Sequence, residues 1–310
     1  MGPTEDRRLL RLALERLPGL RAADRTLLDA VLDGPRALSV LSRNSIEEIL
    51  GRRLGEKLGR VGEALSAAER DKAFMESRGI REVALADPDY PPVLRETARP
   101  PSMLYVRGSL PEPWLPALAI VGTRYPCGAG LEAAYALGAE AASLGMPVVS
   151  GLARGVDAAA HRGAAEAPGR TWAVLGSGAD SPYPPRNREL AARILERGGG
   201  LISEYPPGTE PRPFRFPERN RIIAGLCRAV VVVEAPRGSG ALITAQFALD
   251  EGRDVAVARV RGGPLGDGCR ALAADGAREL ASALELALEW NDTYTIEATE
   301  PRLAYAGKEP

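Results

Sequence analysis

Three turns of small residues, two of them with an arginine, follow short apolar runs of the chain, and each stands just before a segment with a helical pattern. Backbone amides that are free at a helix amino terminus, together with arginine, suit a phosphate group. The spacing of the first turn is not GxGxxG, which favours a single phosphate over a dinucleotide. The alternative is that the glycines serve tight turns alone. The turns are Gly122-Thr123-Arg124, Ser150-Gly151 with Arg154, and Ser239-Gly240.

A fourth segment, residues 203–221, interleaves proline, aromatic and basic residues. Residues 205–228 carry five arginines and two glutamates, a local net charge of +3, although the whole chain has a net charge of −1. Aromatic faces beside arginines suit single-stranded nucleic acid, because bases stack and phosphates pair with cations. The alternation of Phe214 and Phe216 predicts that one ring points inward and the other outward. The candidate binding residues here are Arg212, Arg215, Phe216, Arg219 and Asn220.

The sequence gives little support for a catalytic site or a metal site. Asp157 and His161 stand one helical turn apart, but no nucleophile accompanies them, so we expect a structural role. His161 is the single histidine, and Cys127, Cys227 and Cys269 are widely spaced. We therefore expect no catalytic residue, no metal, no cofactor and no disulfide scaffold. The polar amino terminus and the absence of a long apolar run predict a cytoplasmic protein without a membrane span.

These residues must be positioned by a parallel sheet. Short apolar runs that alternate with helical segments predict an α/β, Rossmann-like domain over residues 117–290, with helices on both faces of the sheet. In such sheets, ligands bind beyond the carboxyl ends of the strands. The expected strands are 117–122, 147–150, 171–176, 200–203, 229–234 and 254–258, and the expected helices are about 129–144, 155–166, 186–197 and 240–251.

The remainder of the chain divides into three further parts. Residues 1–75 read as a small all-helical domain, in which Leu17-Pro18-Gly19-Leu20 is either a plain turn or the hairpin of a helix-hairpin-helix module that contacts phosphates. Ser45 with Glu48 is a candidate capping box. The proline-rich residues 76–116 predict an extended connector, with a short strand at 103–106. Residues 291–310 read as a polar tail.

Five collinear runs resemble the DNA-processing protein DprA/Smf family over about residues 76–280. The runs are AIVGTR, SGLARGVDAAAH, AVLGSGADSPYPPRN, ISEYPPGTEPRPFRFPERNRIIAGL and VVVEAPRGSGALITAQFALDEGRDV. The resemblance implies sequence-independent binding and protection of single-stranded DNA, loading of the RecA recombinase, and a homodimer formed through the Rossmann-like domain. It places Arg124, Arg212, Arg215 and Phe216 in the DNA pocket, beside Arg219-Asn220, with Ser150-Gly151 and Ser239-Gly240 as its walls.

The chain departs from the family pattern near its carboxyl end. Arg259-Val260-Arg261-Gly262 stands where the family usually has Pro-Gly, and residues 268–273 differ from a family stretch that lies towards the dimer and RecA surfaces. The residues after 290 are too few for the winged-helix-like domain that many members carry, so either the protein lacks this domain or the chain is truncated. Because of these departures, the sequence does not predict which residues contact the recombinase or the second subunit of a dimer.

The main alternative is a nucleotide-processing hydrolase on the same fold. Such enzymes place a glutamate soon after a glycine-rich turn, whereas this chain has Gln246 after Arg237-Gly238-Ser239-Gly240. A neutral amide cannot act as a general base. A nuclease would need clustered carboxylates for metal ions, and none is evident. A pure protein-binding adaptor would leave the basic segment 205–228 without a purpose.

Overall fold

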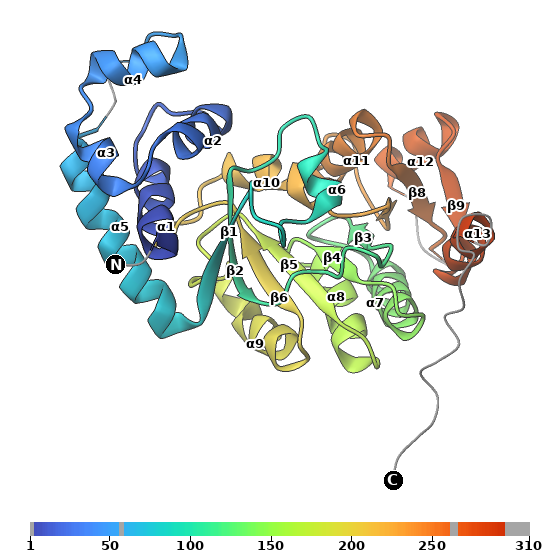
Figure 1. The fold of residues 1–310 in the computed structure, drawn as a ribbon. Helices are drawn as coiled ribbons and strands as arrows, with labels where there is room; N and C mark the ends of the chain where they lie inside the picture. Colours follow the sequence, from blue (N-terminus) through green and yellow to red (C-terminus); the bar gives the residue numbers. More distant parts are fainter. Residues whose placement is uncertain (1–2, 56–58, 261–265, 295–310) are drawn as a thin grey trace.

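The computed structural model describes residues 3–55, 59–260 and 266–294. Figure 1 shows a group of helices at the amino-terminal end beside a twisted sheet that helices cover. The helices are α1 (Pro3–Glu15), α2 (Ala22–Val31), α3 (Pro35–Val40), α4 (Arg43–Leu50), α5 (Val61–Arg78), α6 (Pro92–Arg95), α7 (Gly128–Ser143), α8 (Val156–Glu166), α9 (Arg188–Glu196), α10 (Arg215–Gly225), α11 (Gly240–Asp250), α12 (Asp267–Ala274) and α13 (Leu284–Tyr294), with a 3-10 turn at Pro185–Asn187.

The strands form one mixed sheet in the order β1-β2-β6-β5-β4-β3-β7-β8-β9. The six expected strands are all present as β3 to β8, and they pair in parallel. The predicted α/β fold with a Rossmann-like parallel sheet is therefore confirmed. The strands are β1 (Ile80–Ala84), β2 (Met103–Gly108), β3 (Leu118–Val121), β4 (Val148–Ser150), β5 (Thr171–Leu175), β6 (Gly200–Ser203), β7 (Ala229–Val232), β8 (Asp254–Ala258) and β9 (Arg278–Leu280).

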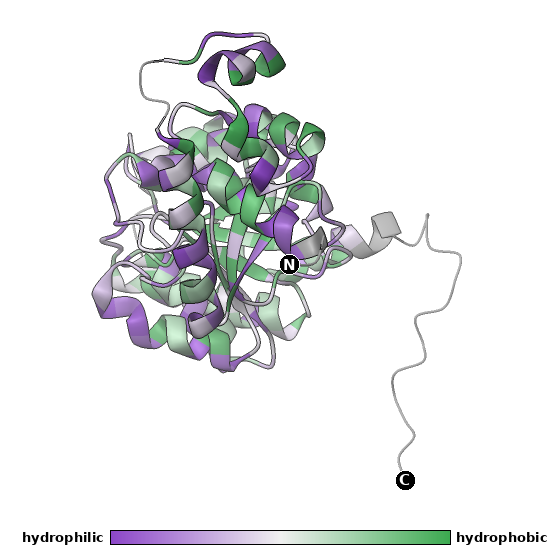
Figure 2. Cartoon of the chain, turned by 60° about the vertical axis from the view of Figure 1, so that its left-hand side comes forward, coloured by the Kyte–Doolittle hydropathy of each residue, from purple (hydrophilic) through white to green (hydrophobic). Residues whose placement is uncertain are grey.

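Successive apolar side chains along the strands point to opposite faces of the sheet, so a hydrophobic core forms on each face. In β3, Ala119 and Val121 pack with α6, α10 and α11, whereas Leu118 and Ile120 pack with α7, α8 and α13. This is the period-two pattern of a strand that is buried on both faces. Figure 2 shows hydrophobic segments along the strands in the middle of the molecule and hydrophilic segments on the outer helices and loops.

The segment between the helices and the parallel strands is more ordered than an extended connector. The predicted strand at 103–106 is present in β2, but β1 was not predicted, and both strands join the sheet. β1 pairs antiparallel with β2, and β2 pairs antiparallel with β6. The prolines of this segment lie outside both strands, in loops or at the first residue of α6, since proline cannot donate to a ladder of hydrogen bonds.

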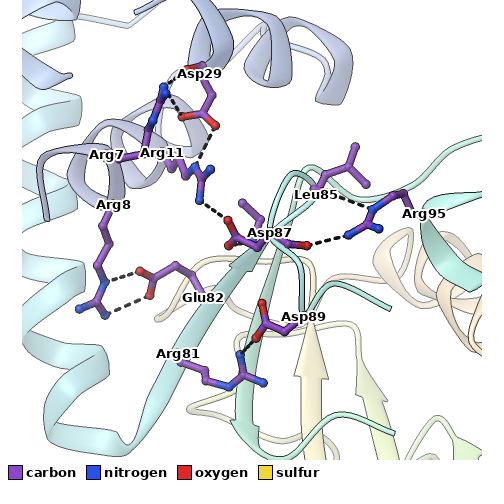
Figure 3. A network of polar contacts seen from close by, with 11 residues as sticks. Arg7, Arg8, Arg11, Asp29, Arg81, Glu82, Leu85, Asp87, Asp89 and Arg95 are labelled. Atoms are coloured by element: carbon purple, nitrogen blue, oxygen red, sulfur yellow. Dashed lines mark hydrogen bonds and ion pairs between the residues drawn. The ribbon is translucent and has the colours of Figure 1, made fainter. Parts of the chain in front are cut away.

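The amino-terminal helices pack directly against this edge of the sheet. Their leucine core is continuous with Met103 and Tyr105 of β2. Ion pairs border the apolar contact: Arg8 of α1 pairs with Glu82 of β1, and Arg11 bonds to both Asp29 of α2 and Asp87 after β1 (Figure 3). The helical part and the sheet are thus joined by apolar burial as well as by charge.

Two local predictions in and after the helical region need correction. The cap of α4 is Ser42, whose hydroxyl accepts from the Ser45 amide, so Ser45 lies inside the helix rather than at its N-cap. The segment after β6, predicted as a loop through to β7, contains α10. Pro217 does not prevent this helix because it lies in the first turn, where a missing amide removes no internal hydrogen bond. The predicted tail beyond residue 294 lies outside the described residues.

No helix in the described part of the chain is long and apolar enough to cross a membrane.

The close packing of α7 on α8 depends on small residues. A Cβ at Gly138 of α7 would collide with the carbonyl oxygen of Ala160 in α8, and one at Gly163 of α8 would collide with that of Tyr135. Close-packed interiors do not absorb such an overlap cheaply.

We predict that Gly138→Ala lowers the free energy of unfolding by about 1–3 kcal/mol, the usual cost of overpacking. Urea denaturation measures this change. Gly128→Ala is the matched control, because a Cβ at the start of the same helix meets open space. Equal stability of the two variants would contradict the packing argument.

Candidate functional site

A cavity of about 480 Å³ opens beyond the carboxyl ends of β3 and β7. The chain leaves β3 for β4 on one side and later returns to β7 on the other, so the cavity stands at the switch point of the sheet order. Eight of the expected site residues line the cavity, namely Gly122, Thr123, Arg124, Phe216, Arg219, Asn220, Ser239 and Gly240.

The turn after β3 is held against its neighbours by its backbone. The Thr123 amide donates to the Glu234 carbonyl just after β7, and the Thr123 carbonyl accepts from the Val156 amide at the start of α8. Gly122 is required here, since a Cβ would lie 2.6 Å from the Val156 side chain. The turn is therefore fixed before any ligand arrives.

The amino terminus of α11 faces the same cavity. Ser239 is its N-cap, yet its hydroxyl caps no amide and has no hydrogen-bond partner among the described residues, although the oxygen is buried. Gly238 before it has φ +73°, a conformation that favours glycine. A helix amino terminus with a spare hydroxyl and free amides is suited to an anion.

Aromatic and basic side chains form one wall of the cavity. The Arg124 guanidinium lies 5.7 Å from the centre of the Phe216 ring, and the Tyr183 ring lies 5.6 Å from Phe216 on a tilted plane. Arg124 is exposed, Phe216 is partly buried, and Phe214 is 63% exposed. The predicted alternation of an inward and an outward phenylalanine is thus observed.

Arg219 and Asn220 lie at the back of the cavity and tie its walls together. Arg219 is 4% exposed, and its guanidinium donates to the carbonyls of Gly151 after β4 and Val174 in β5. The Asn220 amide donates to the Gly240 carbonyl at the start of α11, at 3.1 Å. Burial lowers the pKa of Arg219 to about 10, partly opposed by Asp157, so the group stays charged at neutral pH.

Asp157 and His161 are both buried, and each has its own partners. The Asp157 carboxylate accepts from the amides of Gly151 and Ala153, while His161 Nδ1 contacts the Thr171 hydroxyl at 2.7 Å. Burial raises the pKa of Asp157 and lowers that of His161 to about 3. The two side chains therefore bond to other groups, and both residues fix local structure, as expected for a structural role.

Five expected site residues lie outside the cavity wall. The Ser150 hydroxyl is fully buried and donates to the Ile120 carbonyl, and Gly151 packs against the Arg219 guanidinium. Arg154 is exposed and stacks on Tyr125, Arg215 stacks on Tyr205 and Phe214, and Arg212 is exposed. The fold thus separates two interior residues, Ser150 and Gly151, from three arginines that lie at or near the surface.

The sequence reading missed several residues of the cavity. Tyr125, Pro213, Pro217, Ile243 and Thr244 line it, and Tyr183 reaches the Phe216 ring. Tyr125 had a signal in the sequence, because it directly follows Arg124. Tyr183 had none, since only the fold brings the loop after β5 to α10.

The described residues contain no group of three His, Cys, Asp or Glu side chains arranged to hold a metal ion. Cys127, Cys227 and Cys269 are free thiols. Gln246 bonds to Asp250 on the exposed side of α11, away from the cavity lining.

We predict that Arg219→Ala lowers the free energy of unfolding by about 3 kcal/mol, because it leaves two carbonyls and a buried carboxylate without their cation. Thermal and urea unfolding measure the loss. Arg197→Ala, at an exposed arginine after α9, is the control. Wild-type stability of the Arg219 variant would contradict a structural role for this group.

The pH dependence of stability provides a second prediction. The unfolded pKa of His161 is 6.5 and the folded pKa is about 3, so its contribution is fully present above pH 6.5 and falls as the pH drops towards 3. Between pH 7 and pH 5 we expect a loss of about 2 kcal/mol. The raised pKa of Asp157 has the opposite effect on stability, because the folded state then binds more protons as the pH falls.

His161→Asn keeps Asp157 and removes the imidazole, so the difference between the two proteins isolates the histidine. Urea unfolding at pH 7 and pH 5 measures that difference. A variant with the same pH dependence as wild type would show that His161 does not titrate as its burial predicts.

Comparisons with known proteins agree on one family. The family model for DNA recombination-mediator protein A matches residues 81–291. The chain is 39% identical to DNA processing protein DprA of Streptococcus pneumoniae over 208 residues, covering 67% of this chain and 73% of that protein. It is 49% identical to protein Smf of Synechocystis over 173 residues, covering 54% of this chain and 43% of that protein.

Coverage of the first relatives is partial. The chain spans about half the length of the Smf proteins of Synechocystis and Escherichia coli, at 43% and 56%.

Two solved structures are similar along most of their length. The X-ray structure of DprA from Streptococcus pneumoniae has a TM-score of 0.72 at 32% identity and covers 91% of this chain and 97% of its own. DNA processing protein A from Helicobacter pylori, described by its single-stranded DNA binding mode, has a TM-score of 0.61 at 25% identity, covering 69% of this chain and 96% of its own. The chain therefore belongs to the DNA recombination-mediator protein A family, whose curated members are named DprA and Smf.

Proposed function

We propose that this protein binds single-stranded DNA without sequence specificity in the cavity beyond β3 and β7. The observation that carries the proposal is the Arg124–Phe216 contact beside the free amino terminus of α11. An aromatic face and a cation are the two groups that single strands need, because every base has a face to stack and every nucleotide a phosphate. The Helicobacter pylori relative described as binding single-stranded DNA supports the same reading.

The distribution of arginine ion pairs supports an anionic ligand. Arg8, Arg11 and Arg16 in the amino-terminal helical part are each paired with a carboxylate. By contrast, Arg124, Arg154 and Arg212 form no salt bridge with a carboxylate in the described residues. A chain with a net charge of −1 thereby keeps a local positive field at the cavity rim.

In the proposed complex, phosphates contact Arg124 and the amides at the start of α11, while a base stacks on Phe216. Arg219 and Asn220 act from behind the wall as positioning residues. Gly122 and Gly240 let the strand approach the backbone closely. These contacts read the backbone and the faces of bases rather than base edges, so binding depends on salt and tolerates any sequence.

The hydrolase alternative has weaker support. Among the described residues that line the cavity, only Asp157 has a carboxylate, and it is buried and already accepts hydrogen bonds from two backbone amides. Gln246 offers no general base, and its amide bonds to Asp250. We therefore propose a binding protein without catalysis.

The wider role follows from the family and forms part of this proposal. We propose that the protein acts in the cytoplasm, protects single strands, and helps to load the RecA recombinase in natural transformation or recombinational repair, as a homodimer formed through the Rossmann-like domain. The family resemblance supports these assignments. The departure at residues 261–262 falls outside the described residues.

The test is fluorescence anisotropy of a labelled dT oligonucleotide at two salt concentrations, with duplex as competitor. We expect Arg124→Ala to weaken binding about tenfold, the usual loss of one hydrogen bond to a charged group. The slope of log affinity against log salt should also fall by about 0.7, the value for one phosphate of a single strand.

Arg197→Ala controls for the general loss of a positive charge. Arg197 lies after α9 and just before β6 begins, so it is at the amino ends of the parallel strands, away from the cavity. Unchanged affinity and salt slope for the Arg124 variant would place the DNA elsewhere. Full competition by duplex would reject a preference for single strands.

A further inference from the structure

A second aromatic–arginine pair stands at the cavity beside Arg124. The Tyr125 ring is 72% exposed, lines the cavity, and has the Arg154 guanidinium 4.9 Å from its centre. A large aromatic ring exposed to this degree adds little to the core. An exposed cation–π contact contributes only about 0.5–1 kcal/mol, so folding does not require this pair.

The backbone nevertheless holds the two residues side by side. Tyr125 follows β3, and Arg154 follows β4. The two loops meet at Gly155, which has φ +79° and where a Cβ would collide with the Thr123 carbonyl and lie 2.8 Å from the Arg124 carbonyl carbon. The Tyr125 amide also donates to the Thr123 hydroxyl at 3.2 Å. An exposed pair is thus presented by a rigid, closely packed backbone.

The two aromatic–arginine pairs involve adjacent residues of the turn after β3. Arg124 lies over Phe216, whereas the next residue, Tyr125, lies under Arg154. Neither Arg124 nor Arg154 has a salt bridge to a carboxylate within the described ranges. A path from Phe216 past Arg124 to Tyr125 and Arg154 therefore offers ring, cation, ring, cation, which is the order in which a single strand presents base and phosphate.

We propose that Tyr125 and Arg154 form a second nucleotide subsite, in which a base stacks on the tyrosine ring and its phosphate pairs with Arg154. The subsite rests on the proposed function, because it extends the path of the same strand out of the cavity. It takes an unpaired nucleotide, since a base inside a duplex has no face free to stack. Tyr125 is a binding residue here, and Gly155 is the residue that positions it.

The experiment compares Tyr125→Ala, Tyr125→Phe and Phe216→Ala with wild type, using dT oligonucleotides of increasing length in anisotropy titrations. Tyr125→Ala should bind long oligonucleotides about 5- to 150-fold more weakly, the range for loss of one stacked base. It should match wild type on oligonucleotides too short to reach the second subsite. Tyr125→Phe keeps the ring and should bind like wild type.

Trp114→Ala is the control for removal of an exposed aromatic side chain, because Trp114 is 59% exposed and precedes β3 at the other end of that strand. Arg154→Ala should lower the salt slope by about 0.7. A second readout is the fluorescence of 2-aminopurine, placed at one position in each of a series of oligonucleotides. Wild type should quench this fluorescence at two positions of the series, and Tyr125→Ala should quench it at one fewer.

The outcomes separate the subsite from the function. Tyr125→Ala with wild-type affinity at every length, alongside a weakened Phe216→Ala, overturns the subsite and leaves the proposed function standing. Equal losses for Tyr125→Phe and Tyr125→Ala overturn stacking by the ring. Wild type that binds no dT oligonucleotide at low salt overturns both proposals.

Discussion

The candidate site depends on one buried cation. The Arg219 guanidinium reaches from α10 to the carbonyls of Gly151 and Val174, and thereby fixes the ends of β4 and β5 against the helix that carries Phe216. Asn220 beside it bonds to Gly240 and so adds the start of α11. An arginine is suited to this position because its planar fork presents several donors to separate acceptors. Removing it would leave two buried carbonyls without this donor and the Asp157 carboxylate without its nearby cation.

Because the buried bonds of Arg219 and Asn220 fix the walls of the cavity, the exposed side chains of the site do not have to hold the fold together. Since the walls are fixed from behind, the exposed side chains need only offer rings and charges: Arg124 and Phe216 on one side, and Tyr125 and Arg154 on the other. Binding by such a preformed site costs less conformational entropy than binding by loops that must first be ordered. The same close packing requires the glycines at 122, 151 and 155. At each of them a loop or a side chain approaches the backbone too closely to leave room for a Cβ.

The sequence predicted the parallel strands well because each is a short apolar run followed by a helical segment. β1 and β9 escaped prediction because they are edge strands whose residues are partly exposed, as in the pattern of Arg278 and Glu279 in β9. α10 was predicted as loop because of Pro217 and the prolines that precede the helix. Five residues of the predicted turns and three of the segment 203–221 line the cavity, but their residue types could not distinguish a buried polar group from an exposed one. Ser150 and Arg219 were both expected to contact a ligand. The Ser150 hydroxyl is an interior donor, and Arg219 lines the cavity while its guanidinium donates to two backbone carbonyls; only the three-dimensional position of these acceptors reveals these bonds.

The central claim is that a single strand lies on the turns after β3 and β7, and hydrogen–deuterium exchange tests it most directly. The measurement compares the protein alone, with a dT oligonucleotide, and with duplex of the same length. The account predicts slower exchange in residues 122–127 and 238–244 with the single strand only. Protection confined to the amino-terminal helices, or the same protection with duplex, would contradict it.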